Sequence, residues 1–443
     1  MEETPKSVPE TATQFGYDLL RWAWVEPSVW TARMLTALEQ GVKGGYWFSL
    51  IDKVYSERCL TAAAFQVEAN RGAAGVDHVT VKAFGERQET EVAKLSEQLR
   101  AGTYRPQAVR RVHIPKPGTK ETRPLGIPTV RDRVVQTAVV KVIEPIFERD
   151  FAEQSYGFRP GRGCKDRVPS GWRRVDQLLQ AGYTFVVDAD LKSYFDTIPH
   201  ERLMDRVRTK IRDGHLLTLI ESFLKAGILD GLTEWNPAAG APQGAVLSPL
   251  LSNIYLDPLD HLLAEQGFEM VRYADDFVIL CRTAEEAEQA LQIVQQWTSD
   301  KGLTLHPTKT RIVNAVTEGF DFLGYTFRRG KHFPRTKSRQ KLKAAIRAKT
   351  RRTSGDSLSR IIADVNRTLR GWYEYFKHSP RAYLRPLDSW TRQRLRSLLR
   401  RRSHRPGRAA GRDQVCWPNA FFAAHGLFNL VAAQDAVVQP SRR

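Results

Sequence analysis

Three aspartates occupy positions where buried strands are expected to end. Asp275 and Asp276 interrupt the apolar stretch VRYADDFVIL (271–280), and Asp190 closes the β-branched stretch YTFVVDADL (183–191). One aspartate at a turn is ordinary turn chemistry, but two carboxylates about 4 Å apart repel by about 4 kcal/mol at an effective dielectric near 20. Three at the tips of neighbouring strands therefore predict a divalent cation site. Mg²⁺ suits such a site because it takes hard oxygen ligands and leaves positions for phosphate, as phosphoryl transfer requires.

Four other residues could complete a site for a nucleoside triphosphate. The stretch 110–128 reads as a hairpin that carries Lys116 and Arg123 on opposite sides of its turn, although both could be ordinary solvent-facing charges. Phe195 follows Asp190 closely enough to line the same pocket, or it packs in the core. Gln243, in a Pro-Gln-Gly turn before an expected helix, could face a ligand or cap that helix.

The elements that must position these residues follow from periodicity and turn signals. Strands are expected at 183–191, on either side of Ala274, and at 320–327 (FDFLGYTF), with a helix over 130–150 and another after the turn at 242–244. A capping box from Thr283 to Glu286 predicts the start of a helix. Three further helical segments are expected at about 336–353, 357–378 and 383–400.

The positive charge is concentrated in one segment. The chain has a formal net charge of +19, yet residues 328–412 contain 27 Lys and Arg against 4 Asp and Glu. Such a block indicates a polyanion-binding surface, nucleic acid being the usual polyanion. The alternative is a disordered basic tail, but aromatic residues such as Trp372, Tyr375 and Trp390 are not typical of one.

Other features limit the class of protein. The polar, acidic N-terminus is no signal peptide, and no apolar run approaches the ~18 residues of a membrane span. The four cysteines are far apart and lack zinc-ligand spacing, which predicts a reducing compartment. We therefore expect a cytoplasmic protein.

Six blocks along the chain carry a family resemblance. They are RPLGIPTVRDRVVQ, SYGFRPGRG, DADLKSYFDTIPH, APQGAVLSPLLSNIYLDPLD, YADD and LTLHPTKTRIV…FLGYTF. In this order they resemble the reverse transcriptases encoded by bacterial group II introns, over about residues 50–430. PRTKSRQKLKAAIRAKTRR…RGWYEYFKH resembles the thumb, or maturase domain, of that family. The chain resembles the compact type that lacks an HNH endonuclease domain.

The resemblance implies an α+β fold of the right-hand polymerase type with a helical thumb. The expected parts are an N-terminal extension (1–49), fingers (50–185), palm (186–330), helical thumb or maturase domain (331–400) and a basic C-terminal segment that binds DNA or RNA (401–443). FLGY (322–325) matches the primer grip. One departure is GCKDRVPSGWRRV (163–175), where Pro169 and Gly171 are expected to break or shift the helix that follows the glycine-rich loop.

The resemblance also implies roles for individual residues. Asp190, Asp275 and Asp276 match the Mg²⁺ ligands. Lys116 and Arg123 match residues that hold the triphosphate, Phe195 the gate that rejects a 2′-OH, and Gln243 a residue near the nucleotide sugar. For nucleic-acid binding, the candidates are Arg159, Arg162, Lys309, Arg351, Arg352, Trp372 and Tyr375, although the aromatic ones could instead pack in the thumb core.

The implied function is an RNA-directed DNA polymerase with maturase activity, using Mg²⁺ and nucleoid-associated in a bacterium. Its implied partners are group II intron RNA, a template–primer duplex, target DNA and dNTPs. One alternative is a domesticated relative acting in DNA repair or phage defence. Another is a non-catalytic RNA-binding splicing factor, which predicts loss of at least one metal-binding aspartate, whereas all three are present.

Overall fold

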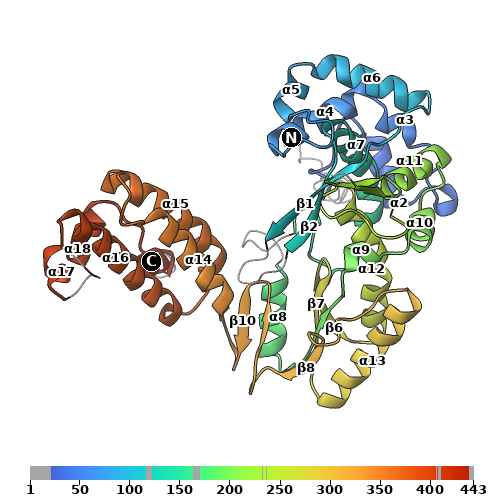
Figure 1. The fold of residues 1–443 in the computed structure, drawn as a ribbon. Helices are drawn as coiled ribbons and strands as arrows, with labels where there is room; N and C mark the ends of the chain where they lie inside the picture. The colour runs from blue at the N-terminus through green and yellow to red at the C-terminus, as the bar shows by residue number, and fades with distance from the viewer. Residues whose placement is uncertain are drawn as a thin grey trace, which may run out of the picture. The chain divides into compact units, whose positions relative to one another are not determined.

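The computed structural model describes residues 21–115, 122–162, 170–231, 233–235, 237–405, 407 and 411–438 (Figure 1). The chain forms two compact units, each built from segments that are discontinuous in sequence. Unit 1 comprises Met1–Arg162, Ala189–Phe277 and Glu288–Thr310, and unit 2 comprises Gly163–Asp188, Val278–Ala287 and Arg311–Arg443. The mixture of helices and sheets, with a helical C-terminal region, confirms the predicted α+β class. The five-part division of the chain stays a prediction.

Unit 1 is mostly helical. Its helices are α2 (Ala32–Gln40), η1 (Lys43–Gly45), α3 (Ile51–Val54), α4 (Glu57–Ala69), α5 (Val81–Gly85), α6 (Gln88–Arg100), α7 (Val130–Glu148), α9 (Tyr194–Thr197), α10 (His200–Arg208), α11 (Gly214–Leu224), α12 (Ser248–Glu265) and most of α13 (Ala284–Asp300). The predicted helix over 130–150 is α7. It is apolar around most of its circumference and is correspondingly buried, packing against α4. The Thr129 hydroxyl caps it by accepting a hydrogen bond from the Asp132 amide at 3.1 Å.

The predicted hairpin is part of a four-stranded sheet in unit 1. β1 (Val109–Pro115) and β2 (Thr122–Ile127) are antiparallel, with Ile114 opposite Arg123. β1 also pairs in parallel with β4 (Ile228–Asp230), which is antiparallel to β5 (Thr233–Trp235), so the strand order is β2-β1-β4-β5. The hairpin is thereby attached to a strand much later in the sequence.

A second four-stranded sheet carries the aspartates. Its strand order is β6-β7-β3-β8, with the bounds β3 (Phe185–Asp190), β6 (Glu269–Tyr273), β7 (Asp276–Cys281) and β8 (Arg311–Asn314). The ends of β3 and β7 that carry Asp190 and Asp276 belong to unit 1. Within unit 2, β3 is antiparallel to β8, with Val187 opposite Ile312. Half of the predicted capping box forms, because the Glu286 amide donates to the Thr283 hydroxyl at 3.2 Å, whereas the Glu286 carboxylate accepts from the Arg282 amide at 2.8 Å.

In unit 2 the stretch FDFLGYTF is a tight hairpin, which corrects the prediction of one strand. β9 (Phe320–Phe322) and β10 (Tyr325–Arg328) are antiparallel, and β10 pairs onward with β11 (Lys331–Pro334). Leu323 and Gly324 between them have φ of 47° and 82°. Positive φ at both central residues is what a two-residue hairpin turn of type I′ requires, so the sequence signal was the glycine within the aromatic run.

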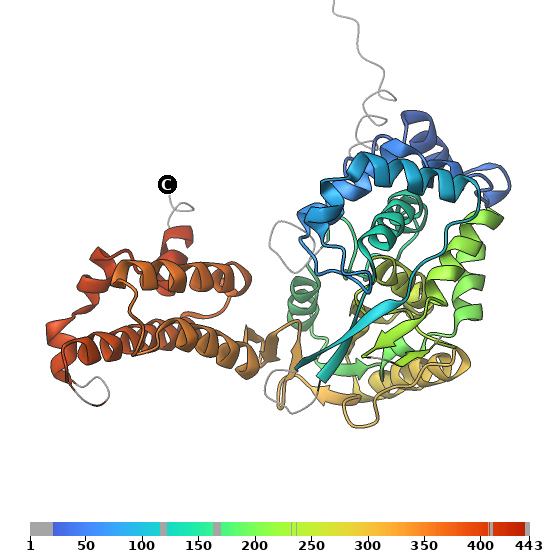
Figure 2. The same ribbon diagram turned by 45° about the horizontal axis from the view of Figure 1, so that its top comes forward.

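The remaining helices of unit 2 are α8 (Gly171–Gln180), α14 (Thr336–Lys349), α15 (Leu358–Phe376), α16 (Arg381–Arg402), α17 (Gly411–Cys416), α18 (Asn419–Ala424) and α19 (Leu430–Val438). α14, α15 and α16 lie side by side, as both ribbon views show (Figure 2). Their core contains the apolar stripe of α15, including Ile361, Val365 and Leu369. The three predicted helices are therefore present. α8 begins at Gly171, and the expected break at Pro169 lies outside the described residues.

Candidate active site

The turn between β6 and β7 holds the adjacent aspartates. Ala274 occupies it with a φ of 61° and is only 4% exposed, so a left-handed non-glycine residue is enclosed by protein. Such a conformation is uncommon and persists where surrounding contacts determine it. Asp275 is half-buried beside it, and Asp276 is exposed as the first residue of β7. The turn therefore presents two carboxylates from a backbone that surrounding protein contacts hold in one conformation.

A buried ion pair supplies much of that support. The fully buried Arg272 guanidinium donates to both Asp260 carboxylate oxygens, at 2.7 and 2.5 Å. Its Nη1 donates at 2.9 Å to the Asn253 side-chain oxygen and to the Ala274 carbonyl. Burial lowers the pKa of Arg272, but the charge and hydrogen bonds of Asp260 together with other nearby groups outweigh this effect and leave the pKa raised. Arg272 thus ties the turn to helix α12.

The glycine-rich loop SYGFRPGRG lies directly against the same turn. A Cβ on Gly157 would come within 2.3 Å of the Ala274 amide nitrogen, so only glycine fits there without movement. The Asn253 side-chain amide donates to the Gly157 carbonyl at 2.8 Å, and the Tyr156 amide donates to the Arg272 carbonyl at 2.8 Å. The backbone at Tyr156 and Gly157 thus supports the aspartate turn.

Asp190 and Asp275 come together electrostatically although they are far apart in sequence. Burial raises the pKa of the Asp275 carboxyl, and the negative charge of Asp190 raises it further. A backbone hydrogen bond at the turn and the charges of Arg123 and Arg272 act in the opposite direction. The Lys309 ammonium lies 2.8 Å from a carboxylate oxygen of Asp190 and partly neutralises it.

The donor chemistry fits Mg²⁺. The side chains are carboxylates, and the repulsion recorded at Asp275 is what a divalent cation relieves. Among the described residues, no three His, Cys, Asp or Glu side chains surround one point. An ion held by Asp190 and Asp275 would therefore need water or substrate phosphate to complete its coordination.

Three of the four predicted nucleotide-binding residues lie around this site. The Arg123 charge acts on both Asp275 and Asp196. Phe195 packs edge-on against Tyr194 at 5.4 Å between ring centroids, and the buried Tyr194 hydroxyl donates to the Ser252 carbonyl at 2.9 Å. Lys116 lies outside the described residues.

The Gln243 turn is held against the β1–β2 hairpin. The Gly126 amide donates to the Gln243 carbonyl at 2.6 Å. Gly244 has a φ of 104°, and a Cβ there would come within 2.4 Å of the Gly126 carbonyl oxygen, so the Pro-Gln-Gly sequence permits this close approach. Helix α12 begins only at Ser248, later than predicted. Gln243 therefore does not cap it, and its side chain lines a cavity that Phe195 also lines.

Among the predicted nucleic-acid contacts in unit 1, the structure corrects the one at Arg159, whereas those at Arg162 and Lys309 stay predictions. Arg159 is 5% exposed, donates to both Glu148 oxygens at 2.8–3.0 Å and to the Ala152 carbonyl at 2.6 Å. It is a structural residue, because its guanidinium is enclosed and bonded within the protein. Arg162 pairs with Glu153 at 2.5 Å, and Lys309 pairs with Asp190. The sequence alone did not show that the Arg159 side chain is buried.

In unit 2, Trp372 and Tyr375 take part in packing. Trp372 packs against the helical core and lies 4.6 Å from Phe376 between ring centroids. The Tyr375 hydroxyl donates to the Leu323 carbonyl at 2.6 Å, and the Tyr375 carbonyl accepts from the Tyr325 hydroxyl. Tyr375 thus joins α15 to the FLGY turn. These contacts favour the core-packing alternative for both aromatic residues.

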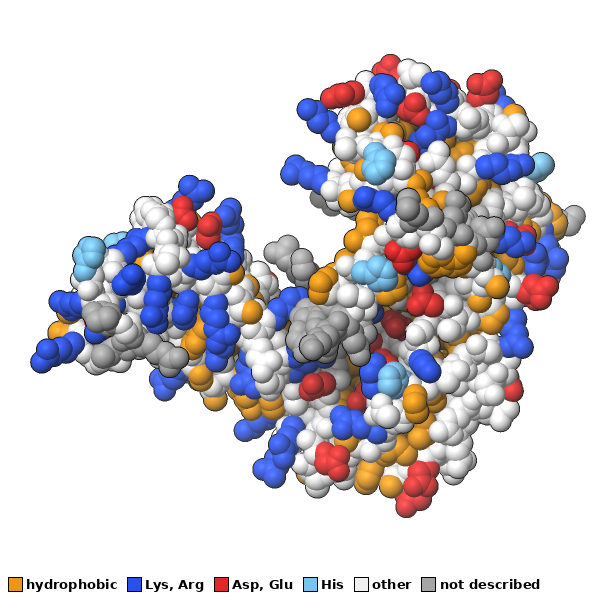
Figure 3. Space-filling model, viewed as in Figure 1, with side chains coloured by type: hydrophobic (Ala, Val, Ile, Leu, Met, Phe, Trp, Pro, Cys, Tyr) orange, Lys and Arg blue, Asp and Glu red, His pale blue; other side chains and the backbone are white. Residues whose placement is uncertain are grey.

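The charge of unit 2 gathers over its helices, as the space-filling view shows (Figure 3). One group, here called the basic cluster, consists of Lys343 and Arg347 beside Trp390 together with Arg352 and Arg394, whose charges act with that of Arg347. The Lys343 ammonium and the Arg347 guanidinium lie 5.5 and 5.4 Å from the Trp390 ring centroid. Burial lowers the pKa of Arg394, and the charges of Arg352 and Arg347 lower it further.

This basic cluster includes one predicted residue and adds others. Arg352 belongs to it, and Arg351, the neighbouring candidate, is exposed at the end of α14. Arg347 and Arg394 were missed because they lie on different helices and meet only in the fold. Arg272 and Gly157 were also missed, although an arginine inside an apolar strand next to two aspartates is a signal that could have found the first.

Comparisons with known proteins agree with this arrangement. Residues 114–327 match the family model for reverse transcriptase (RNA-dependent DNA polymerase), and residues 339–417 match the group II intron maturase-specific domain. Among described residues, no helix has both the length and the apolar character to cross a membrane.

Curated relatives are similar over different lengths. Protein YkfC of Escherichia coli is 34% identical over 69% of this chain and 86% of its own length. The group II intron-encoded protein LtrA of Lactococcus lactis is 39% identical, but the alignment covers 44% of this chain and 32% of LtrA. A solved Cas6-RT-Cas1–Cas2 complex is 27% identical over 57% of this chain and 26% of that chain, with a TM-score of 0.37, too low to carry an argument.

The two family matches follow the same order along the chain as the structure. The polymerase match contains the aspartate turn, and the maturase match contains the helices that follow. The polymerase family match includes Asp190, Asp275 and Asp276, and the maturase match begins at residue 339, three residues into α14. The chain belongs to the family of group II intron reverse transcriptases with a maturase domain.

Proposed function

We propose that this protein copies RNA into DNA at the Asp190–Asp275–Asp276 site and that Mg²⁺ is held there. The observation that carries the proposal is the convergence of Asp190 and Asp275, because the charge of Asp190 raises the pKa of Asp275. Buried Arg272 supports the turn that holds Asp275. When bound, paired Mg²⁺ ions assist attack by the primer hydroxyl and stabilise the leaving oxygen.

The chain's own residues orient the substrates. The positive charge of Arg123, which lowers the pKa of Asp275, attracts the triphosphate. Lys116 adds a second positive charge from the same hairpin. The Phe195 ring, packed against buried Tyr194, provides a rigid surface under the sugar and excludes a 2′-hydroxyl. Gln243 contacts the nucleotide from the turn that is hydrogen-bonded to Gly126.

Unit 2 binds group II intron RNA and supports its splicing in this proposal. The basic cluster supplies phosphate contacts, whose strength falls with salt through counterion release, and Arg351 adds a further exposed charge. In the same proposal, the protein binds intron RNA and target DNA and uses dNTPs as substrates. It acts in the bacterial cytoplasm near the nucleoid.

Primer extension tests the polymerase assignment. On an RNA template with dNTPs and Mg²⁺, the wild type should extend a DNA primer. Asp190→Asn and Asp275→Asn should each lose about four orders of magnitude in rate, as residues of a shared catalytic unit do. Asp188→Asn is the matched control on strand β3, because the Asp188 carboxylate lies 3.5 Å from Arg311 and is not among the predicted ligands. Extension by the Asp275→Asn protein at the wild-type rate would refute the assignment.

The sugar gate is tested separately. Phe195→Ala should admit ribonucleotides while retaining dNTP extension, and Phe195→Tyr should keep the discrimination. Unchanged rejection of ribonucleotides by Phe195→Ala would remove Phe195 from this role. Sequencing the RNA that copurifies with the full chain tests the maturase assignment, since enrichment of group II intron RNA is expected.

A further inference from the structure

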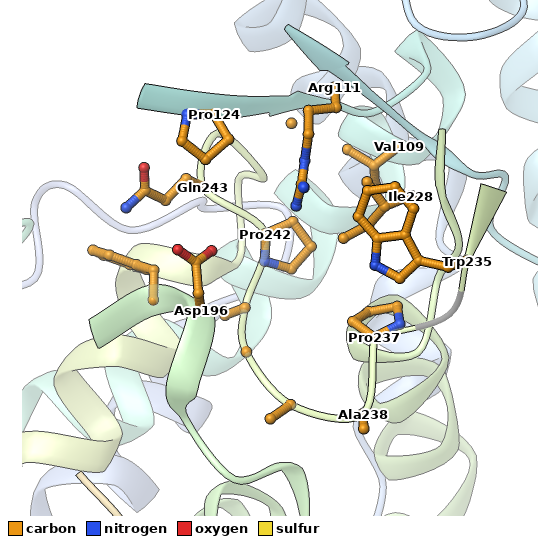
Figure 4. A pocket seen from close by; sticks show the side chains of 15 residues that line it. Val109, Arg111, Pro124, Asp196, Ile228, Trp235, Pro237, Ala238, Pro242 and Gln243 are labelled. Atoms are coloured by element: carbon orange, nitrogen blue, oxygen red, sulfur yellow. The ribbon is translucent and has the colours of Figure 1, made fainter. Parts of the chain in front are cut away.

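A cavity of about 500 Å³ lies in unit 1 beside the proposed nucleotide site (Figure 4). Its apolar walls include Val109 of β1, Ile228 of β4, and Pro237 and Pro242 of the loop before α12. The volume is within the range of small-molecule sites, which are mostly apolar with a few converging polar groups. Phe195 and Gln243 also line it, yet the proposed polymerase function does not use the rest of the cavity.

Three side chains with specific chemistry project into this cavity. The Arg111 guanidinium carbon lies 4.6 Å from the centroid of the Trp235 ring, which is 37% exposed. Figure 4 shows the Arg111 and Asp196 side chains extending from opposite sides of the cavity into the same space. Within the described part of the chain, neither side chain has a hydrogen-bond or ion-pair partner.

The surroundings of Asp196 make this free carboxylate notable. Partial burial raises its pKa, while the charges of Arg111 and Arg123 oppose the rise without forming an ion pair with it. The side chain nevertheless remains accessible to solvent in the cavity, so its two oxygens can accept hydrogen bonds from a bound ligand. The cavity therefore offers one acceptor-only group, one donor-only group and an aromatic wall.

These groups match one nucleobase better than the others. A carboxylate accepts through two oxygens and a guanidinium only donates. Guanine presents two adjacent donors, N1–H and the N2 amine, on one edge, and the acceptors O6 and N7 on another. Adenine, cytosine and uracil lack two adjacent donors. Bases also stack on aromatic rings and on arginine planes.

We propose that this cavity binds a guanine base, with Asp196 accepting from N1–H and N2–H and Arg111 donating to O6 or N7. Trp235 and the apolar walls enclose the ring. The base belongs either to a free guanine nucleotide or to an unpaired guanosine of RNA, since both present the same edges. Binding needs neither Mg²⁺ nor the catalytic aspartates, so it is separable from the proposed polymerase function.

Equilibrium dialysis of the full chain against GMP, AMP, CMP and UMP, in EDTA, tests the base preference. GMP should bind at least about tenfold more tightly than the other three, the scale of one bidentate base contact. The Asp275→Asn protein should bind GMP as the wild type does. Equal affinity for all four nucleotides would overturn the proposal.

The Asp196→Asn variant gives a readout that a merely structural role would not produce. Its amide can donate to the oxygen that replaces the N2 amine in xanthine, so preference should switch from GMP to xanthosine monophosphate. Asp205→Asn, on α10 in the same unit, is the matched control and should keep the GMP preference. Retained GMP preference in Asp196→Asn would refute the assignment, and Trp235→Leu should weaken GMP at least about fivefold.

A pair of short RNAs distinguishes the two sources. A single-stranded hexamer with one guanosine should compete with GMP if the base comes from RNA, whereas the same hexamer with adenosine should not. If only the free nucleotide binds, GMP affinity is unchanged in the presence of either hexamer. Both results support a guanine site, whereas displacement of GMP by the adenosine hexamer as well as by the guanosine hexamer would contradict it.

Discussion

The two units use charge in opposite ways. In unit 1, two arginines near the aspartate turn are buried and paired, Arg272 with Asp260 and Arg159 with Glu148. In unit 2, the basic cluster places Arg347, Arg352 and Arg394 near one another at the protein surface, with like charges acting on Arg394.

This difference has a physical cause. A buried ion must be paired, because leaving it alone in a low dielectric costs several kcal/mol. A surface ion is solvated, so like charges can crowd at modest cost until a polyanion neutralises them. The first arrangement holds a backbone turn in one conformation, whereas the second provides affinity without specifying a conformation. Single substitutions should therefore have large effects on stability in unit 1 and graded, salt-dependent effects on binding in unit 2.

The largest expected effect is at Arg272. Arg272→Met should lower the free energy of unfolding by about 3–5 kcal/mol, because it leaves Asp260 buried without a partner. Urea denaturation followed by circular dichroism measures this. Arg282→Met, which removes an exposed arginine near the end of β7, is the control and should cost under about 1 kcal/mol.

A second variant separates pairing from shape at this position. Replacing both partners, with Arg272→Met and Asp260→Leu, should recover part of the lost stability because no buried charge remains. If the double variant is no more stable than Arg272→Met alone, the support for the turn comes from packing rather than from the ion pair.

In the basic cluster, the double substitution Arg347→Gln and Arg352→Gln should have opposite effects on binding and on stability. Affinity for single-stranded RNA at low salt should fall about tenfold, and the dependence of log affinity on log salt should become shallower by about 1.4. Stability should rise slightly because repulsion at Arg394 is relieved. Fluorescence anisotropy across a salt series measures the affinity.

The control for this charge loss is Lys82→Gln with Lys94→Gln, two exposed lysines of unit 1. It removes the same charge from another surface. Equal loss of RNA affinity in the two double variants would mean that net charge, rather than the basic cluster, determines RNA binding.

Tyr375 distinguishes packing from RNA stacking. Tyr375→Phe keeps the ring but leaves the Leu323 carbonyl without its hydroxyl donor, so stability should fall by about 1 kcal/mol. RNA affinity should stay within about twofold. Thermal denaturation and anisotropy on the same samples check both, and a loss of RNA affinity without a loss of stability would restore the RNA-binding interpretation.

The smallest expected effect concerns Asp275. Its folded-state pKa is raised, so the folded protein binds more protons than the unfolded chain, and stability falls as pH rises through that pKa. Asp275→Asn should therefore raise the melting temperature at pH 7 and flatten its dependence on pH. Adding Mg²⁺ should stabilise the wild type more than the variant, whereas a lower melting temperature for Asp275→Asn would contradict this account.

Much of the fold was accessible from local patterns. The hairpin 110–128, the helix over 130–150, the strands around Ala274 and the three helices of the thumb region follow from periodicity and turn residues, which report local geometry. The strand at 320–327 was wrong because a turn of two residues can hide inside an aromatic run, where only Gly324 marked it.

Taken alone, the sequence determined the identity of the three aspartates, the order of the family motifs and the block of positive charge, because these depend on residue types and spacing. Tertiary structure alone decided that Arg159 is buried, that Arg272 supports the turn, and that Arg347 meets Arg394. Burial and partners depend on contacts between residues far apart in the chain. A charged side chain has the same letter whether it is solvated or enclosed.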